Sequence, residues 1–393
     1  QILDEAKALL TFHDGVGAQV VFGGTNFNSD LRNLRDKRCD ILVATPGRLI
    51  QHLEDGDRDL LRDVNVLVLD EADRLLDMGF KPSIEKILRS VPRDRQSLMF
   101  SATVSDEIKK IAAAGLRPGH VYVDCVGEEE GPDTNLQVKQ SLATAPLARQ
   151  MPTLAQIVDD HVATTPNHKI MCFFTTARGT GFAAELFRSF RDDIVEIHSK
   201  MSQSKRTKAT DQFRAAKRAV MMTSDVTARG IDFPDVTLVV QIGIPATREQ
   251  YIHRLGRTAR AGKSGEGILV LAPHEEFFAK KNVGDLPISR ATIDVSEENV
   301  VKISRAMDAV SDKTKALAYA AWLGFHKQHI KKMGWTPEML VREANDYATE
   351  TMGCPEPPPI MKMIIGRMGL KGVPGFNIVS VPPEYDDDGG RQR

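Results

Sequence analysis

Cysteine is scarce in this chain: four cysteines are spread over 393 residues, and none belongs to a CxxC pair. This spacing indicates neither a cysteine-ligated zinc site nor a disulfide framework, and it is typical of proteins from a reducing compartment. The chain also lacks an apolar run long enough to cross a bilayer. We therefore expect an ordinary globular protein without a membrane partner.

A strong charge of one sign is missing too, because the formal net charge is -1 at pH 7. No global positive field attracts a nucleic acid. This argues only weakly against such a partner, since a local groove of basic residues is sufficient. The length predicts two or three domains.

The N-terminus lacks a methionine, a helix cap and a targeting segment. Gln1-Ile2-Leu3 opens within an apparent amphipathic helix. We expect a fragment or a truncated gene model.

The most informative stretch is VNVLVLDEAD, residues 64–73. Its first six residues are apolar except Asn65, which predicts a strand buried on both faces of a helix-covered parallel sheet. Ligands of such sheets bind at the carboxyl ends of strands, where Asp70 and Glu71 would lie. Two acids there suit nucleotide hydrolysis: Asp70 would hold Mg²⁺, and Glu71 would orient and deprotonate the attacking water. The alternative is an acidic cap on the next helix.

Two other expected strands in the first half also end in suggestive residues. Residues 19–22 lead into Gly23-Gly24, which form either a turn or a close approach to phosphate. Residues 40–44 lead into Thr45-Pro46-Gly47-Arg48 and a helix. The N–H groups at that helix start, with Arg48, would make an anion site. A proline-initiated helix start is an equally good interpretation.

A further strand, residues 97–100, ends in Ser101-Ala102-Thr103. Hydroxyl groups at that position can hydrogen-bond the neighbouring carboxylates. The tripeptide is common, so its value depends on following the acidic motif by one strand–helix unit.

The acidic segment 127–135, with glycine and proline, predicts a linker. A second alternating series of strands and helices follows it. Strands are expected over 169–174, 194–198, 219–223 and 238–242, a helix is expected over 182–190 after the turn 175–181, and residues 267–271 close the sheet. Within this series, residues 251–260 predict a helix with Arg257 and Arg260 on one face. Two guanidinium groups there suit clamping a γ-phosphate, whereas a solvated basic helix face is the alternative.

From Pro273 onward the pattern is mostly helical, with helices expected over 298–322, 323–332, 337–349 and 360–368. Residues 381–393 predict a disordered acidic tail.

Taken in order, these motifs resemble those of DEAD-box ATP-dependent RNA helicases. The resemblance is carried by Thr45-Pro46-Gly47-Arg48, Asp70-Glu71-Ala72-Asp73, Ser101-Ala102-Thr103, Gln203 to Arg206, Ala228 to Asp232 and His253 to Arg260. It implies an α/β protein with two RecA-like parallel-sheet lobes that close on ATP and single-stranded RNA. The expected domains are an incomplete first lobe (1–126), a linker (127–135), a second lobe (136–273), a helical extension (274–380) and the tail (381–393).

The resemblance also implies residue roles. Asp70 would be the Mg²⁺ ligand and Glu71 the water-activating base, while Ser101 and Thr103 would couple hydrolysis to strand separation. Arg257 and Arg260 would contact the γ-phosphate. The remaining ATP-binding residues would be Asp73, Gly230, His253 and the ribose contact Asp232. The RNA-backbone contacts would be Gly24, Thr45, Pro46, Gly47, Arg48, Thr175, Arg178, Gly179, Arg206 and Thr223. Backbone contacts carry no sequence information, so we expect sequence-independent unwinding.

One departure from the family is large: the Gly-Lys-Thr phosphate loop and the adenine-reading glutamine motif are absent from this chain and would lie upstream of Gln1. Without that loop, we expect the isolated chain to bind ATP poorly. Our first interpretation is an RNA-dependent ATPase, using ATP and Mg²⁺, that unwinds short duplexes locally as a monomer. The alternatives are a truncated, ATPase-dead RNA-binding protein and a DNA helicase of the wider superfamily, against which the DEAD sequence argues.

The extension, with Gly179, Phe182 and the GRTAR form of residues 256–260, resembles the mitochondrial RNA chaperones of fungi. This resemblance implies a role in organellar intron splicing and a location in the mitochondrial matrix.

Overall fold

The computed structural model describes residues 1–77, 79–101, 104–124, 138–227, 233–259 and 264–381. They form two compact units, Gln1–Glu129 and Glu130–Arg393. Several sequence-based predictions lie outside the described residues: Thr103, Gly230, Asp232, Arg260, the linker 127–135 and all of the tail except residue 381.

The first unit contains two pairs of parallel strands, β1 (Ala18–Val21) with β2 (Ile41–Ala44) and β3 (Val66–Leu69) with β4 (Gln96–Met99). Its α-helices are α1 (Ile2–Leu9), α2 (Phe27–Asp36), α3 (Pro46–Asp55), α4 (Ala72–Asp77), α5 (Lys81–Ser90) and α6 (Asp106–Gly115), and a 3₁₀ turn spans Leu10–Phe12. The expected strands and the helices after them are therefore present, with small shifts of their ends.

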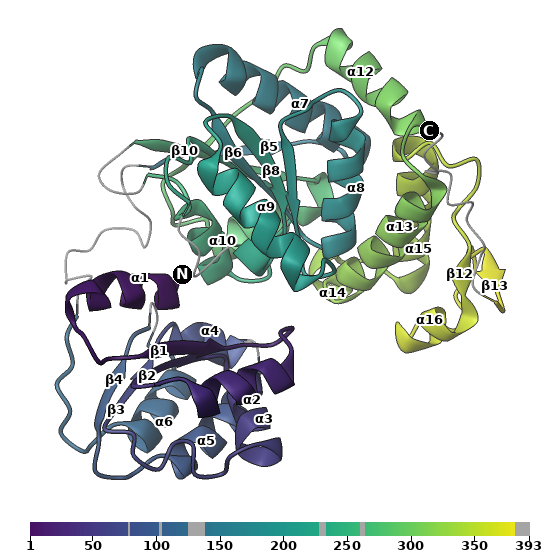
Figure 1. Cartoon of the computed structure of the whole chain (residues 1–393). Coiled ribbons are helices and arrows are strands. Elements are labelled where there is room, and N and C mark those ends of the chain that lie inside the picture. Colours follow the sequence, from purple (N-terminus) through teal and green to yellow (C-terminus); the bar gives the residue numbers. More distant parts are fainter. Residues whose placement is uncertain (78, 102–103, 125–137, 228–232, 260–263, 382–393) are drawn as a thin grey trace, which may run out of the picture. The chain divides into compact units, whose positions relative to one another are not determined.

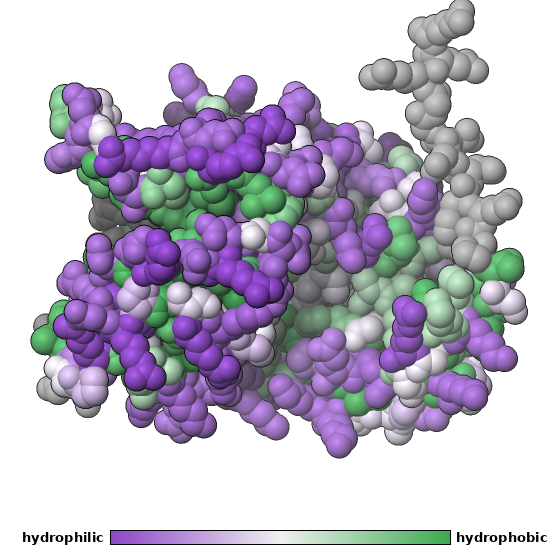
Figure 2. Space-filling model, turned by 60° about the horizontal axis from the view of Figure 1, so that its bottom comes forward, coloured by the Kyte–Doolittle hydropathy of each residue, from purple (hydrophilic) through white to green (hydrophobic). Residues whose placement is uncertain are grey.

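The helices α3, α5 and α6 pack on one face of these strands, against side chains such as Leu67 and Leu69. The opposite face of β3 is open, since Val66 is 52% and Val68 51% exposed. The prediction that this strand is buried on both faces is therefore wrong. Side chains alternate along a strand, and the described helices cover only one side. Apolar side chains are also visible among the polar ones on the face drawn in Figure 2.

The second unit is built on a seven-stranded parallel sheet with the order β11-β5-β10-β9-β6-β8-β7. Its strands are β5 (Val138–Thr144), β6 (Lys169–Phe174), β7 (Ile194–Ile197), β8 (Ala219–Thr223), β9 (Leu238–Ile242), β10 (Gly265–Leu271) and β11 (Ile288–Arg290). The central strands are wholly buried, as expected for a sheet covered on both faces. The α/β class is thus confirmed.

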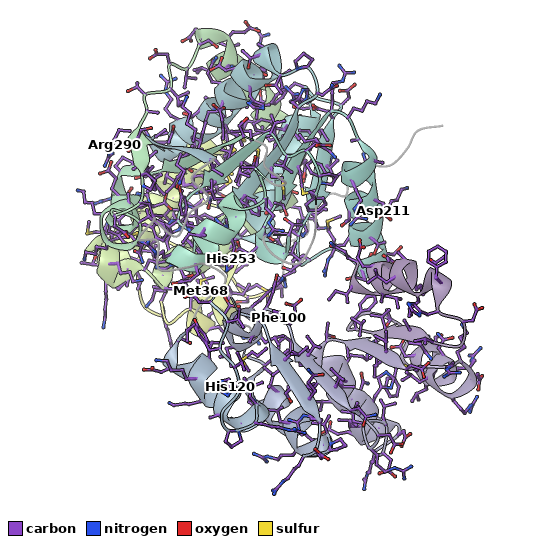
Figure 3. All side chains as sticks on the ribbon, turned by 90° about the vertical axis from the view of Figure 1, so that its left-hand side faces the viewer. Phe100, His120, Asp211, His253, Arg290 and Met368 are labelled. Atoms are coloured by element: carbon purple, nitrogen blue, oxygen red, sulfur yellow. The ribbon has the colours of Figure 1, made fainter. Side chains whose placement is uncertain are left out.

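We expected the sheet to close at Leu271, but it continues beyond that residue. β11 pairs with β5 at the far edge and ends at Arg290, which is labelled in Figure 3. Residues 274–290 therefore contribute to the sheet unit before the helical extension begins. A three-residue edge strand has too short a pattern to be recognised in the sequence.

The helices that accompany this sheet are α7 (Leu147–Thr164), α8 (Ala177–Arg188), α9 (Gln203–Ala215), α10 (Arg248–Leu255) and α11 (Glu276–Asn282), with 3₁₀ turns at Asp225–Thr227 and Pro273–Glu275. Two of them differ from expectation. α8 begins at Ala177, because the Thr176 hydroxyl accepts the Gly179 N–H at 3.0 Å and caps it. α10 ends at Leu255, before Gly256.

The helical extension comprises α12 (Glu297–Asp308), α13 (Asp312–Lys327), α14 (Ile330–Met333), α15 (Pro337–Asp346), a π-helical turn (Tyr347–Thr351) and α16 (Lys362–Arg367), with the short strands β12 (Ile360–Met361) and β13 (Ile378–Val379). α13 lies beside α8 (Figure 1). Apolar side chains from α12, α13 and α15 share one core with the sheet. Among the described helices, none is both long and apolar enough to span a membrane.

Candidate functional site

The ends of β3 and β4 lie together because backbone hydrogen bonds continue past both strands. The N–H of Phe100 donates to the Leu69 carbonyl at 2.8 Å, and the N–H of Ala72 donates to the Phe100 carbonyl at 3.0 Å. Phe100 is labelled in Figure 3. These bonds place Asp70, Glu71 and Ser101 at one edge of the strand pair, as the sequence analysis expected for parallel neighbours.

The backbone of Glu71 is held in the left-handed region, with φ of +47°. Such a conformation costs a non-glycine residue about 1–3 kcal/mol and is common at functional sites. The Asp70 Oδ1 atom accepts the N–H of Glu71 at 2.9 Å, and the Glu71 Oε2 atom accepts from Arg74 Nη1 at 3.2 Å. Both carboxylates are therefore oriented by short-range hydrogen bonds.

The carboxylate of Asp70 suits a magnesium ligand. It is exposed, and no lysine or arginine among the described residues pairs with it. Mg²⁺ prefers such oxygen ligands and usually keeps several waters. Asp73, in contrast, is buried in the first turn of α4.

Arg48 is buried beneath the loop that carries Gly24. Its guanidinium donates to the Phe22 carbonyl at 3.1 Å and to the Thr25 hydroxyl at 3.2 Å, and it lies 3.6 Å from the carboxylate of Asp30. These bonds engage the guanidinium within the first unit itself. The structure thus places Arg48 as a support for the loop, where the sequence analysis expected an exposed anion contact.

The residues around Arg48 are more open. Thr45 is the N-cap residue of α3, and its side chain makes no capping hydrogen bond. Thr45 and Gly47 are exposed, whereas Pro46 is buried. Gly24 has φ of +92°, which only glycine adopts freely. The free N–H groups at the start of α3 and this glycine loop suit an anionic backbone.

In the second unit, Thr175 follows β6 and leads into the first turn of α8, where Arg178 and Gly179 lie half-buried. Arg206 lies in the first turn of α9, and burial lowers the pKa of its guanidinium. No carboxylate among the described residues pairs with Arg206. Two cationic side chains, Arg178 and Arg206, therefore lie near helix N-termini.

The structure corrects the prediction that Thr223 contacts RNA. Thr223 is the last residue of the central strand β8 and is fully buried. Its hydroxyl donates to the Ile197 carbonyl at 2.9 Å and lies 2.8 Å from the Thr227 hydroxyl. A strand position covered on both faces cannot expose its side chain to a ligand. Thr223 instead anchors the turn that precedes residues 228–232.

The arginines near the end of α10 also differ from expectation. Because the helix ends at Leu255, Arg257 is not on a helical face. It is buried, and its Nε donates to the carbonyl of His253, a residue on α10 labelled in Figure 3. Arg254, on α10 itself, has a structural role that its motif does not indicate. It is 1% exposed, and its Nε donates to Asp225 Oδ1 at 2.6 Å in the turn after β8. Its Nη1 lies 3.5 Å from Gln241 Oε1 of β9, so it holds α10 against the sheet. Sequence spacing does not distinguish such a buried arginine from a ligand contact.

Comparison with known proteins supplies the family. Residues 1–111 match the family model described as DEAD/DEAH box helicase, and residues 151–262 match the helicase conserved C-terminal domain. DEAD-box ATP-dependent RNA helicase 26 of Oryza sativa subsp. japonica is 46% identical over 96% of this chain and 70% of its own length. The chain belongs to the DEAD-box helicase family. DEAD-box ATP-dependent RNA helicase 31 of Arabidopsis thaliana is 45% identical over 96% of the chain, but the chain spans only 52% of that relative.

A solved structure of a DEAD-box protein has the same fold. It is Mss116p, with its NTE and C-tail deleted, bound to single-stranded RNA and AMP-PNP. The TM-score is 0.83 at 27% identity, and the match covers 95% of this chain and 77% of that one. The two RecA-like units are therefore confirmed, and the match includes most of the helical extension.

Proposed function

We propose that this DEAD-box protein is an RNA-dependent ATPase that holds single-stranded RNA by its backbone and locally unwinds short duplexes. The observation that supports it most is the joining of the β3 and β4 ends, which brings Asp70, Glu71 and Ser101 together. The named relatives are 45–46% identical to the chain over the matched residues and are ATP-dependent RNA helicases. They give no support to the ATPase-dead alternative.

In the proposed reaction, Glu71 takes the proton of the attacking water. Its strained backbone and the hydrogen bond from Arg74 fix the direction of its carboxylate. Asp70 would hold Mg²⁺, which when bound offsets charge on the phosphate oxygens. Ser101 lies beside both acids and is placed to report the state of the nucleotide to β4.

The proposed RNA contacts are the exposed helix starts after β2 and β6. Thr45, Gly47 and the Gly24 loop serve in the first unit, and Thr175 to Gly179 with Arg206 serve in the second. Backbone N–H groups and arginines there bind phosphates without reading bases.

The test is RNA-stimulated ATP hydrolysis and duplex unwinding by the full-length protein, including any residues that precede Gln1. We expect Glu71→Gln to lower kcat by about 100-fold or more, because the amide cannot accept the proton. RNA affinity should change little. Glu85→Gln is the matched control, since Glu85 is a solvent-facing residue of α5 with only a 3.9 Å ion pair to Arg89. Equal hydrolysis by the Glu71 variant and the wild type would refute the proposed base.

The narrower proposal is membership of the subgroup of mitochondrial RNA chaperones, with a role in organellar splicing. It is supported by the extension, which the Mss116p structure shares across most of its length. We propose a monomer located in mitochondria. Microscopy of the tagged full-length protein tests the location, and a purely nuclear or cytosolic signal would contradict it.

A further inference from the structure

Three potential metal ligands converge where the helical extension meets the second sheet. His274 and Glu275 come from the 3₁₀ turn Pro273–Glu275 after β10, and His326 comes from α13. One ligand atom from each lies within 4.8 Å of the other two. Glu275 and His326 are almost fully buried. His326 lies 51 positions after Glu275, so no sequence motif indicated this cluster.

The hydrogen bonds of His326 direct its Nε2 atom at a carboxylate. Its Nδ1 atom lies 3.0 Å from the Trp322 carbonyl, which can only accept, so Nδ1 carries the proton. The Nε2 atom then faces Glu275 Oε1 at 3.3 Å. Either a proton or a metal ion can lie between these two atoms. The separation is long for a charge-assisted hydrogen bond, about 2.7–2.9 Å. It suits two ligands of one tetrahedral metal with bonds of about 2.0–2.1 Å.

His274 completes the set. Its Nε2 atom is buried and has no hydrogen-bond partner among the described residues. A buried imidazole nitrogen without a hydrogen-bond partner is available to coordinate a metal. The other carboxylate oxygen of Glu275 is already engaged, because Oε2 accepts the N–H of Ala272 at 2.9 Å.

We propose that His274, Glu275 and His326 bind one transition-metal dication, and that Zn²⁺ matches this donor set best. Two imidazoles and a carboxylate are typical of zinc sites that leave one position for water. A cavity of about 50 Å³ borders Glu275 and His326, enough for that water. The Trp322 ring stacks on the His326 ring with their centroids 3.8 Å apart, and the Trp335 and His274 ring centroids are 4.6 Å apart. The bond from Nδ1 to a carbonyl is the usual support of a zinc-bound histidine.

Such a metal would join the extension to the proposed RNA-contact loop. Glu275 follows the central sheet, whereas His326 belongs to the extension. Gly243 fills the space between Glu275 and Thr175: its φ is +77°, and an added Cβ would lie 2.7 Å from Thr175 Cγ2 and 3.2 Å from Glu275 Oε1. Thr175 and the metal would therefore be separated by one glycine.

The test uses full-length protein that has been stripped with a chelator and then dialysed. Zn²⁺ titration followed by elemental analysis should give one tightly bound zinc per chain and a higher Tm. Co²⁺ in its place should produce visible absorption bands of a four-coordinate site. We expect His274→Gln and His326→Gln to weaken zinc binding by about 100-fold, since each removes a direct ligand. His329→Gln is the matched control because His329 lies three positions after His326, at the start of α14, and is outside the cluster.

A second variant keeps the test decisive if the glutamine variants fold poorly. His274→Cys retains a ligand, so the Co²⁺ form should gain a thiolate-to-cobalt charge-transfer band. Wild-type protein that binds no stoichiometric zinc would overturn the proposal and leave a buried ion pair of His326 and Glu275. Zinc binding that persists unchanged in His274→Gln, or cobalt binding to His274→Cys without the thiolate band, would overturn it too.

Discussion

At the scale of single residues, burial decides what a charge does. Arg48 and Arg35 both lie near an aspartate in the first unit. The side chain of Arg48 is 6% exposed, whereas that of Arg35 is 78% exposed beside Asp36. The first arginine also satisfies the carbonyl of Phe22, so it holds a loop in place. The second contributes little, because water screens an exposed pair.

Replacing Arg48 by alanine should therefore destabilise the first unit. We expect Arg48→Ala to lower the free energy of unfolding by about 3 kcal/mol, because the buried Asp30 carboxylate would lose its cation. Urea denaturation of the full-length protein measures this loss. Arg35→Ala should change the same quantity by less than about 0.5 kcal/mol. Similar effects of the two substitutions would show that Arg48 does not support the loop.

At the scale of elements, side chains at helix ends determine where elements begin and how they dock. The hydroxyl of Ser311 caps α13, accepting the N–H of Thr314 at 3.4 Å. The carboxylate of Glu185, on α8, accepts the N–H of Ser311 at 2.7 Å and the hydroxyl of Thr314 at 2.6 Å. One glutamate thus holds the first turn of α13 against α8, while the cap satisfies another N–H group.

Removing that carboxylate should loosen α13 without unfolding the sheet. We expect Glu185→Ala to lower the free energy of local opening of α13 by about 1.5–3 kcal/mol, the range for hydrogen bonds to a charged group. Hydrogen exchange should show faster exchange at the N-terminal turns of α13 and little change in β6. Glu298→Ala is the control, because Glu298 on α12 is 85% exposed. Unchanged protection of α13 in the Glu185 variant would contradict this account of docking.

At the scale of the whole molecule, the described residues form two units, and the second includes the extension. Leu323 of α13 and Leu340 of α15 are fully buried in the same cluster as Val240 of β9. Because they share one apolar core, the extension and the sheet should unfold together.

The substitution Leu323→Ala tests this shared core. We expect it to lower the free energy of unfolding by about 2–5 kcal/mol, since it leaves a cavity in a packed interior. Loss of the sheet and of the extension helices should remain a single transition by hydrogen exchange. Val301→Ala, at a partly exposed position of α12, should have a much smaller effect. Loss of α13 well before β6 would show that the extension folds on its own.

Local patterns were sufficient for much of this fold. The bounds of β6, β8 and β9 agree with the prediction, since each is a short apolar run ended by polar or turn residues. The closeness of Asp70 and Ser101 followed from the rule that parallel strands end at one edge. The open face of β3 did not follow, because Val66 is as apolar as a buried valine. Coverage depends on which helices pack on it, and that is a long-range property.

The sequence by itself determined the alternating strands and helices, the family and the order of its motifs, because each depends on neighbouring residues. Only the tertiary structure decided which of the similar side chains are free to act. It buried Arg48, Thr223 and Arg254, left Asp70 exposed, and brought His326 to Glu275 from 51 positions away. Burial and convergence arise when distant segments pack together, so no local pattern contains them.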